Sequence, residues 1–258
     1  MSERAHAPST SATSPTDASD WLAAATVDAN VFELRPDYRA LLLTADGLRG
    51  GDSDAVSDRI LTEAETAARG LLAGQPPKQL PHPATWREAY RAFGAKPQRT
   101  RPSVEALLRR LAQGSLPRID RITDVYNAVS IAHVLPIGGE DRAAYVGPPR
   151  LVRADGREPF DTTADGGPAV DHPEPGEVVW RDDAGVTCRR WNWRQCTRTR
   201  ITTETSSALF ILDAVDPLTD DAIHASADAL TGALYELRRD VVVHRRLLAH
   251  PAQAAGTP

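Results

Sequence analysis

Long hydrophobic runs and a secretory leader are both missing from this sequence. No run of about eighteen apolar residues occurs, and a helix that crosses a bilayer needs roughly that length. Residues 1–20 carry neither a basic lead nor an apolar segment of the kind that directs secretion. We therefore expect a cytoplasmic protein with no membrane partner.

Cysteine is also scarce, and the common catalytic signatures are absent. Cys188 and Cys196 are the only two cysteines; their spacing fits no zinc pattern, and a cytosolic compartment disfavours a disulfide. The sequence has no Gly-x-Ser-x-Gly elbow and no glycine-rich phosphate loop, and its seven histidines suggest no triad. These absences predict two ordinary thiols, no metal, no cofactor and no ATP-driven aminoacylation.

The length of the chain suits one domain. Its 258 residues, 41% of them hydrophobic, suffice for a substantial core. Residues 1–19 are rich in Ser, Thr, Ala and Pro without apolar periodicity, so we predict a disordered tail there. Residues 20–250 are assigned to a single domain and residues 251–258 to a flexible C-terminal tail.

Apolar spacing and capping signals predict three helices before the middle of the chain. Apolar side chains recur at steps of three and four from Val56 to Leu71, which indicates one helical face. Thr85 and Glu88 have the spacing of a capping box, so a short helix is expected to begin at Thr85. Another helix is expected to start at Ser103, after a proline.

The middle of the chain is typical of strands. The apolar run at 40–43 predicts a buried strand, and residues 125–135 and 186–193 are among several later segments that also suit strands. A single helix is predicted over residues 223–248, and we expect it to close over a sheet in a monomer rather than to form a coiled-coil dimer. Helices, then strands, then a helix predict the α+β class.

Trp191 and Trp193 fall on one face of the strand predicted at residues 186–193. Two readings are open for this pair. The rings pack against the sheet, which is the commoner fate of tryptophan, or they form a platform on which nucleic-acid bases stack. We favour packing.

The overall charge of −5 argues against a protein that coats DNA or other long nucleic acids. Two stretches are nevertheless basic: residues 87–121 hold nine basic and three acidic residues, and residues 189–200 hold five arginines and no acid. They are either solvated surface or a patch that fits one end of a tRNA. The candidate RNA-binding residues in these stretches are Arg101, Arg109, Arg110 and Arg198.

Several short motifs between residues 86 and 139 occur together in a recognisable order. They are Trp86-Arg87-Glu88-Ala89-Tyr90, Phe93-Gly94, Arg101-Pro102-Ser103-Val104-Glu105-Ala106-Leu107, Leu116-Pro117, Asp124-Val125-Tyr126-Asn127-Ala128-Val129-Ser130 and Leu135-Pro136-Ile137-Gly138-Gly139. This set resembles the stand-alone branch of the B3/B4 domain family, named from the editing module of the phenylalanyl-tRNA synthetase beta subunit. The resemblance covers roughly residues 20–240. It implies layered sheets with packed helices, and tRNA with an aminoacylated acceptor end as the partner.

The family motif has the form Asp-Val-x-Asn followed by Pro-x-His-Ala-Phe-Asp. Asp124, Asn127, Pro136 and Asp141 match it at equal spacing, but the histidine position falls on Gly138. A later Ser-Glu-Val-x-x-x-Thr pattern aligns so that the acid position falls on Arg200. In the family this His and Glu recognise the phenol of misattached tyrosine, so we expect a smaller or aliphatic acyl group here.

The family motifs and the chemistry of residues near them give two sets of candidate site residues, which also have ordinary structural readings. Those assigned to catalysis, where a water is positioned or the amino group held, are Asn127, Asp124, Thr202 and Thr205. Those assigned to substrate binding are Gly138, Gly139, His133, Arg194 and Arg200. A buried His133 is more often a satisfied core residue than a base, and solvated arginines are common.

Two functions remain open at this point. The leading hypothesis is a deacylase that acts in trans on mischarged aminoacyl-tRNA. The alternative is a non-catalytic module that binds tRNA or an amino acid and has kept the fold.

Overall fold

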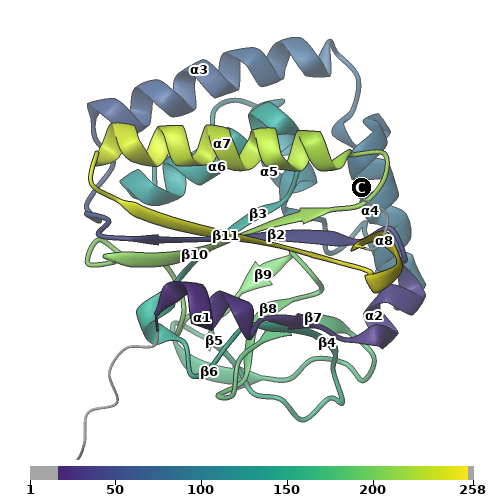
Figure 1. Ribbon diagram of the computed structural model, residues 1–258. Coiled ribbons are helices and arrows are strands. Elements are labelled where there is room, and N and C mark those ends of the chain that lie inside the picture. Colours follow the sequence, from purple (N-terminus) through teal and green to yellow (C-terminus); the bar gives the residue numbers. More distant parts are fainter. Residues whose placement is uncertain (1–16, 255–258) are drawn as a thin grey trace, which may run out of the picture.

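The computed structural model describes residues 17–254. It is an α+β fold with a layer of helices, a central four-stranded sheet and a second, five-stranded sheet (Figure 1). The central sheet is antiparallel and has the order β11-β2-β10-β3. Its strands are β2 (Arg39–Asp46), β3 (Ile137–Asp141), β10 (Ser207–Ala214) and β11 (Val242–Ala249).

The second sheet faces the side of the central sheet that the helical layer leaves open (Figure 1). Its order is β1-β4-β7-β8-β9, and its strands are β1 (Thr26–Val27), β4 (Arg150–Arg153), β7 (Val178–Arg181), β8 (Val186–Arg189) and β9 (Arg194–Gln195). Only the β1–β4 pair is parallel among the strand pairs of residues 17–254. A separate hairpin pairs β5 (Phe160–Ala164) with β6 (Gly167–Asp171).

Helices complete the fold. They are α1 (Ala18–Ala23), α2 (Ala29–Leu34), α3 (Ala55–Leu72), α4 (Pro81–Ala92), α5 (Ser103–Leu111), α6 (Arg121–His133), α7 (Asp220–Leu237) and α8 (Pro251–Ala254), with short 3-10 turns at Pro77–Gln79 and Arg142–Ala144. In the part of the chain that the structure describes, none of these helices combines the length and the apolarity that a bilayer crossing requires.

The central strand β2 shows why the sheet is covered on both faces. Leu41 and Leu43 pack on the helical side with α6 and α7, whereas Ala40 and Leu42 pack toward the second sheet. Successive side chains of a strand point to opposite faces, so an unbroken apolar run is what two covered faces require. The strand predicted from the run at 40–43 is confirmed.

The prediction of a strand at residues 125–135 is wrong, because these residues belong to helix α6. The Asp120 carboxylate caps the helix by accepting the backbone N–H of Thr123 at 2.7 Å. Residues 122–131 are all buried, so the polar residues among them, such as Asn127 and Ser130, do not mark a solvent-facing side of the helix. A short buried segment rich in apolar residues cannot be told from a buried strand by periodicity alone.

The predicted C-terminal helix is right only in its first part. Helix α7 begins after the Thr219 cap and ends at Leu237, and the chain then turns extended at Arg238. Residues 242–249 form strand β11 at the edge of the central sheet. The β-branched residues from Val241 to Val243 favour a strand, although the three-four spacing of the helix continues past them.

The predicted strand through residues 190–194 is interrupted by a tight turn. Arg190 and Trp191 have φ values of 49° and 68°, in the left-handed region. Trp191 is fully buried with its ring edge-on to Trp86 and Tyr38, whereas Trp193 is half-buried beneath the Arg190 guanidinium. The two rings therefore do not form a stacking platform on one face.

Two helix details also differ from prediction. The buried face of α3 includes Leu61, Ala68 and Leu72, and Leu71 is exposed, so the predicted face is displaced by about one residue. Helix α4 begins at Pro81, where a proline is tolerated in the first turn. Thr85 consequently lies inside the helix and donates to the Pro81 carbonyl, so the predicted capping box does not form.

A short helix lies at each end of the described residues, partly or wholly within a predicted tail. Helix α1 begins at Ala18 and α8 covers residues 251–254. The rest of the two predicted tails, residues 1–16 and 255–258, lies outside the described residues. The start of a helix at Ser103 is confirmed, and Cys188 and Cys196 are buried free thiols.

Candidate functional site

A cavity of about 310 Å³ lies between the two sheets and opens beside helices α5 and α6. This volume is near the lower end of small-molecule sites, which span about 300–1,000 Å³. The residues that line it are Ser103, Ala106, Leu107, Arg110, Tyr126, Asn127, Ile137, Gly138, Glu140, Trp180, Cys188, Trp191, Asn192, Trp193, Arg194, Gln195, Ile211 and Asp213.

Strands β3 and β10 supply the wall of the cavity that belongs to the central sheet. Gly138 pairs with Ile211 across the two strands. Because side chains alternate along a strand, Gly138 and Glu140 share one face of β3, and Ile211 and Asp213 share the same face of β10. All four residues line the cavity.

Glu140 places a buried carboxyl group in this wall. The residue is 1% exposed, and its Oε2 accepts hydrogen bonds from Tyr145 Oη at 2.5 Å and Thr199 Oγ1 at 2.9 Å. Its Oε1 has no hydrogen-bond partner among residues 17–254. Burial raises the pKa of Glu140 to about 7, although the hydrogen bonds from Tyr145 and Thr199 oppose that rise.

Asp213 is the second buried carboxyl group of the cavity. Tyr38 Oη donates to its Oδ1 at 2.6 Å, and the Asn192 amide donates to its Oδ2 at 3.3 Å. The Asn192 carbonyl oxygen in turn accepts from Tyr90 Oη at 2.9 Å. Burial raises the pKa of Asp213 to about 7, so the pKa values of both carboxyl groups of the cavity lie near neutral pH.

Cys188 also lines the cavity, but it is a poor nucleophile. It is buried, and burial raises the pKa of its thiol well above the usual range. Since the thiolate is the reactive form, Cys188 contributes packing rather than covalent chemistry. No group of His, Cys, Asp and Glu side chains suited to a metal ion occurs within residues 17–254.

The structure brings three of the predicted catalytic and substrate-binding residues to this cavity. Asn127, Gly138 and Arg194 all line it, together with Arg110. Asn127 is 8% exposed, and no hydrogen bond joins its side-chain amide to any described residue. Arg110 and Arg194 are exposed and form no ion pair within residues 17–254. The motif asparagine and two free cations therefore meet at one opening.

The other predicted catalytic residues serve as anchors outside the cavity. Asp124 is fully buried on α6, where it accepts from Ser53 Oγ at 2.5 Å and from the Ile119 backbone N–H at 2.9 Å. Thr205 Oγ1 donates to Asp141 at 2.8 Å and accepts from the backbone N–H of Thr202 at 3.0 Å. Neither threonine lines the cavity.

The remaining predicted substrate-binding residues also lie elsewhere. His133 lines a separate, shallow depression with His82 and Pro217. Arg200 has an exposed side chain, although its backbone forms a bridge to Glu140. Gly139 faces away from the cavity, where an added Cβ would come within 2.6 Å of the Tyr126 ring. A glycine is needed there because the ring leaves no room.

The place left by the family's histidine is not vacant. A Cβ added to Gly138 would meet Gln195 Nε2 at 3.3 Å, and that amide donates to the Gly139 carbonyl at 2.8 Å. Gln195 therefore reaches across from the second sheet and occupies the side of the cavity next to Gly138. The absence of the imidazole does not simply enlarge the cavity.

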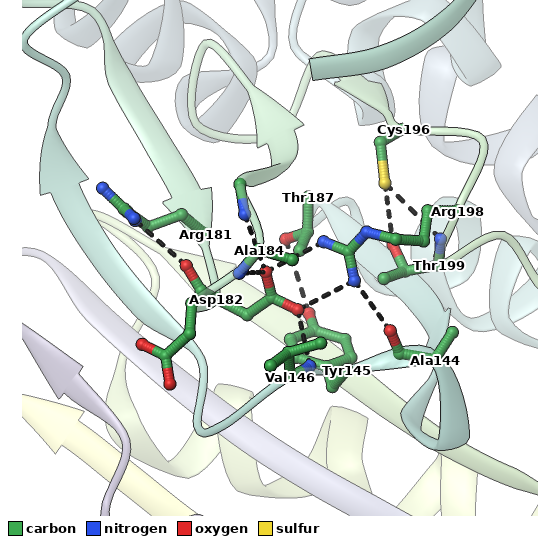
Figure 2. Close-up of polar contacts among 12 residues, drawn as sticks. Ala144, Tyr145, Val146, Arg181, Asp182, Ala184, Thr187, Cys196, Arg198 and Thr199 are labelled. Atoms are coloured by element: carbon green, nitrogen blue, oxygen red, sulfur yellow. Dashed lines mark hydrogen bonds and ion pairs between the residues drawn. The ribbon is translucent and has the colours of Figure 1, made fainter. Parts of the chain in front are cut away.

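Arg198 is held by a buried carboxylate of the second sheet (Figure 2). Its Nη1 and Nη2 donate to the two oxygens of Asp182 at 2.9 and 2.8 Å, and Nη1 also donates to the Ala144 carbonyl at 2.7 Å. Asp182 additionally accepts the backbone N–H groups of Val146, Ala184 and Gly185. These contacts give Arg198 a structural role, and the predicted RNA contact stays a prediction.

The other three candidate RNA-binding residues gather on one surface. Arg101, Arg109 and Arg110 line a groove beside α5 that also includes Gln113 and Ser115. Arg109 and Arg110 are exposed, and Arg110 lines both this groove and the cavity. The groove therefore leads into the opening of the cavity.

Sequence reasoning missed the carboxyl groups of the cavity. The family motif quoted above has Phe where this chain has Glu140, so a carboxyl group in place of a phenyl two residues after Gly138 was the available signal. Asp213 and Gln195 carried no such signal. Their position depends on the pairing of β3 with β10 and on the packing of the two sheets.

Comparison with known proteins agrees with the motif analysis. The model of the B3/4 domain family matches residues 85–242, which is more than half of the chain. The chain therefore belongs to the B3/4 domain family, as the motifs predicted.

Among solved structures, the chain is similar to an N-terminal fragment of the phenylalanyl-tRNA synthetase beta subunit from Pyrococcus horikoshii. The identity is 13% and the TM-score 0.44, over 86% of this chain and 53% of that fragment. The chain thus spans about half the length of the fragment. No protein with a curated description matches the sequence.

Proposed function

We propose that this protein hydrolyses aminoacyl-tRNA in trans at the cavity between the two sheets. The observation that carries the proposal is the meeting of Asn127, whose amide is free of other partners, with the exposed cations Arg110 and Arg194 at one opening. Membership of the B3/4 family supports it, as does the resemblance of the motifs to a tRNA-editing module.

The reaction needs little from the protein because an aminoacyl ester is already activated. Water adds to the ester carbonyl carbon, the bond to the ribose oxygen breaks, and the ribose hydroxyl regains a proton. The enzyme must position the water and stabilise the oxyanion that forms. In our proposal the Asn127 amide donates to that oxyanion, and Arg194 places a positive charge beside it.

The groove beside α5 suits the RNA part of the substrate. Arg101, Arg109 and Arg110 line it, and arginine forms bidentate hydrogen bonds with phosphate. A cavity of about 310 Å³ accommodates an aminoacyl group, so the terminal nucleotides would lie outside, along the groove. The tRNA contact is therefore expected to be local and electrostatic.

One observation favours the alternative of a non-catalytic module for tRNA or an amino acid. Among the described residues no histidine lines the cavity, and burial keeps the Cys188 thiol protonated by raising its pKa. A site that lacks both a histidine base and a reactive thiol can bind an aminoacyl group without hydrolysing it.

The test is a deacylation assay with a panel of correctly charged and mischarged tRNAs, including tyrosyl-tRNA(Phe). We expect the protein to accelerate release of at least one amino acid, with tyrosine not the fastest. Asn127→Ala should lower kcat by about 100-fold, as for loss of one oxyanion donor, whereas Asn30→Ala, at an exposed position on α2, should not. Measurable tRNA binding without accelerated release of any amino acid would favour the binding module.

A further inference from the structure

We propose that the cavity selects an aliphatic side chain that ends in a positively charged amine, as in lysine or ornithine, and that Glu140 is the residue that reads the amine. This inference rests on the proposed function, since it names the acyl group of the same site. It replaces the sequence-based expectation of a wholly aliphatic group with an aliphatic stem that carries a charge.

The first reason is an unsatisfied oxygen atom. Glu140 Oε1 is buried in the cavity wall without a hydrogen-bond partner in the described part of the chain. Buried polar atoms in folded proteins nearly always have a partner, and leaving one unpaired costs free energy. Because Tyr145 and Thr199 occupy Oε2, Oε1 is the atom left for a ligand that donates.

The second reason is the distribution of charge along the cavity. The buried lining residues include two carboxyl groups, Glu140 and Asp213, which are 1% and 2% exposed. The arginines of the lining, Arg110 and Arg194, are exposed and therefore lie at the opening. A ligand group that penetrates beyond the opening meets carboxyl groups without a neighbouring cation, so the interior favours positive charge.

The third reason is the apolar and aromatic surface between these charges. Ile137, Ile211 and Leu107 line the cavity and can cover a methylene stem, in the way that lysine stems pack on apolar surfaces. Trp180 and Trp191 line it as well, and indole side chains attract cations. A stem of several methylenes with a terminal ammonium matches both kinds of surface.

The decisive experiment compares two acyl groups on one tRNA. Lysine and norleucine share the α-amino group and a four-carbon stem, and only lysine carries the terminal amine. The same tRNA is charged with each, and kcat/KM for hydrolysis is measured. We expect lysyl-tRNA to be hydrolysed at least about tenfold faster, which corresponds to about 1.4 kcal/mol in the transition state.

A charge-neutral variant then assigns the selectivity to Glu140. Glu140→Gln keeps the shape and the acceptor for Tyr145 but removes the charge. It should bring the lysine-to-norleucine ratio to within about threefold, chiefly through slower hydrolysis of lysyl-tRNA. Asp183→Asn is the matched control, because Asp183 is an exposed acid that pairs with Arg150; its ratio should equal that of the parent protein.

The outcomes separate this inference from the proposed function. Hydrolysis of norleucyl-tRNA as fast as lysyl-tRNA, or an equal slowing of both by Glu140→Gln, would overturn the inference and leave the hydrolase intact. The binding of non-hydrolysable amide-linked lysyl- and norleucyl-tRNA covers the case without hydrolysis. Tighter binding of the lysyl form would then support the inference while the hydrolase fails, and equal or absent binding would end both. If Glu140→Gln does not fold, the ratio of the parent protein still decides.

Discussion

Two buried carboxyl groups near the second sheet, those of Asp182 and Glu140, differ in whether both of their oxygen atoms accept hydrogen bonds. Asp182 accepts hydrogen bonds from Nη1 and Nη2 of Arg198 and from three backbone N–H groups. Among the described residues, Glu140 has donors on only one oxygen; its other oxygen is buried without a partner, in a residue that lines the cavity. A fully satisfied buried carboxylate holds the architecture together, whereas one with an unpaired oxygen at a cavity is available to a ligand.

Breaking the ion pair between Arg198 and Asp182 should have the largest effect on the stability of the protein. Arg198→Glu leaves Asp182, whose side chain is 0% exposed, beside a second negative charge. The loss of one partner of a buried ion pair typically costs about 3–5 kcal/mol, and we expect a decrease of that size in the free energy of unfolding. Denaturant titration measures it.

The control for Arg198 is Arg157→Glu, because Arg157 is 87% exposed and pairs with the nearby Asp155. That change should leave the free energy of unfolding close to that of the parent protein. A stable Arg198→Glu variant that had lost tRNA affinity would reverse our assignment and make Arg198 an RNA contact.

The Glu140 carboxyl group, which has an unpaired oxygen, should affect how the stability of the protein depends on pH. Burial raises the pKa of Glu140 from 4.5 to about 7, so between these values the folded state binds more protons than the unfolded state. Stability from this group is present at low pH and lost as pH rises to about 7. Glu140→Gln removes the titrating carboxyl group and with it this loss of stability. The Tm of the variant minus the Tm of the parent protein should therefore increase by at least about 3 °C between pH 5 and pH 8.

Two other titrating groups, Asp213 and His82, are present in both the Glu140→Gln variant and the parent protein. Burial raises the pKa of Asp213 to about 7 and lowers that of His82 to about 4, and the histidine acts in the opposite direction on stability. The His82 contribution cancels in the difference between variant and parent. The Asp213 contribution does not cancel fully, because the charge of Glu140 also raises the pKa of Asp213; Glu140→Gln removes that charge and so changes the difference in Tm in the same direction. A difference in Tm that stayed constant from pH 5 to pH 8 would show that Glu140 does not titrate in this range.

The smallest effect on stability is expected at the arginines that lack a carboxylate partner. Arg109→Glu combined with Arg110→Glu should leave the unfolding free energy nearly unchanged, because both side chains are exposed. It should weaken tRNA binding and flatten the plot of log K against log salt by roughly one unit per arginine. Arg157→Glu with Arg239→Glu, at exposed positions outside the groove, is the charge-matched control. Equal salt dependence in the two double variants would identify the α5 arginines as ordinary solvated surface.

Local signals predicted part of the molecule well. The run at 40–43 marked β2, the proline before Ser103 marked α5, and the motif around Asn127 marked one wall of the cavity. Each of these three signals comes from residues that are close together in the sequence.

The features that were missed depend on contacts between distant segments. Helix α6 looked like a strand because its surroundings bury it on every side. The five arginines of residues 189–200 cannot be told apart by their sequence context. In the structure, Arg198 pairs with the buried Asp182, whereas Arg194 is exposed. Glu140 and Asp213 face one cavity because β3 and β10 pair in a particular register.

The burial of α6 fixes one wall of the site for as long as the protein stays folded. A segment opens locally only at the cost of the contacts that it breaks, and α6 is buried from residue 122 to residue 131. Asn127 therefore keeps its position while ligands enter and leave. The opening of the cavity carries exposed positions such as Arg110 on α5 and Arg194 on β9, where substitutions cost little stability. Substitutions there can thus change the ligand without disturbing the helix that holds Asn127.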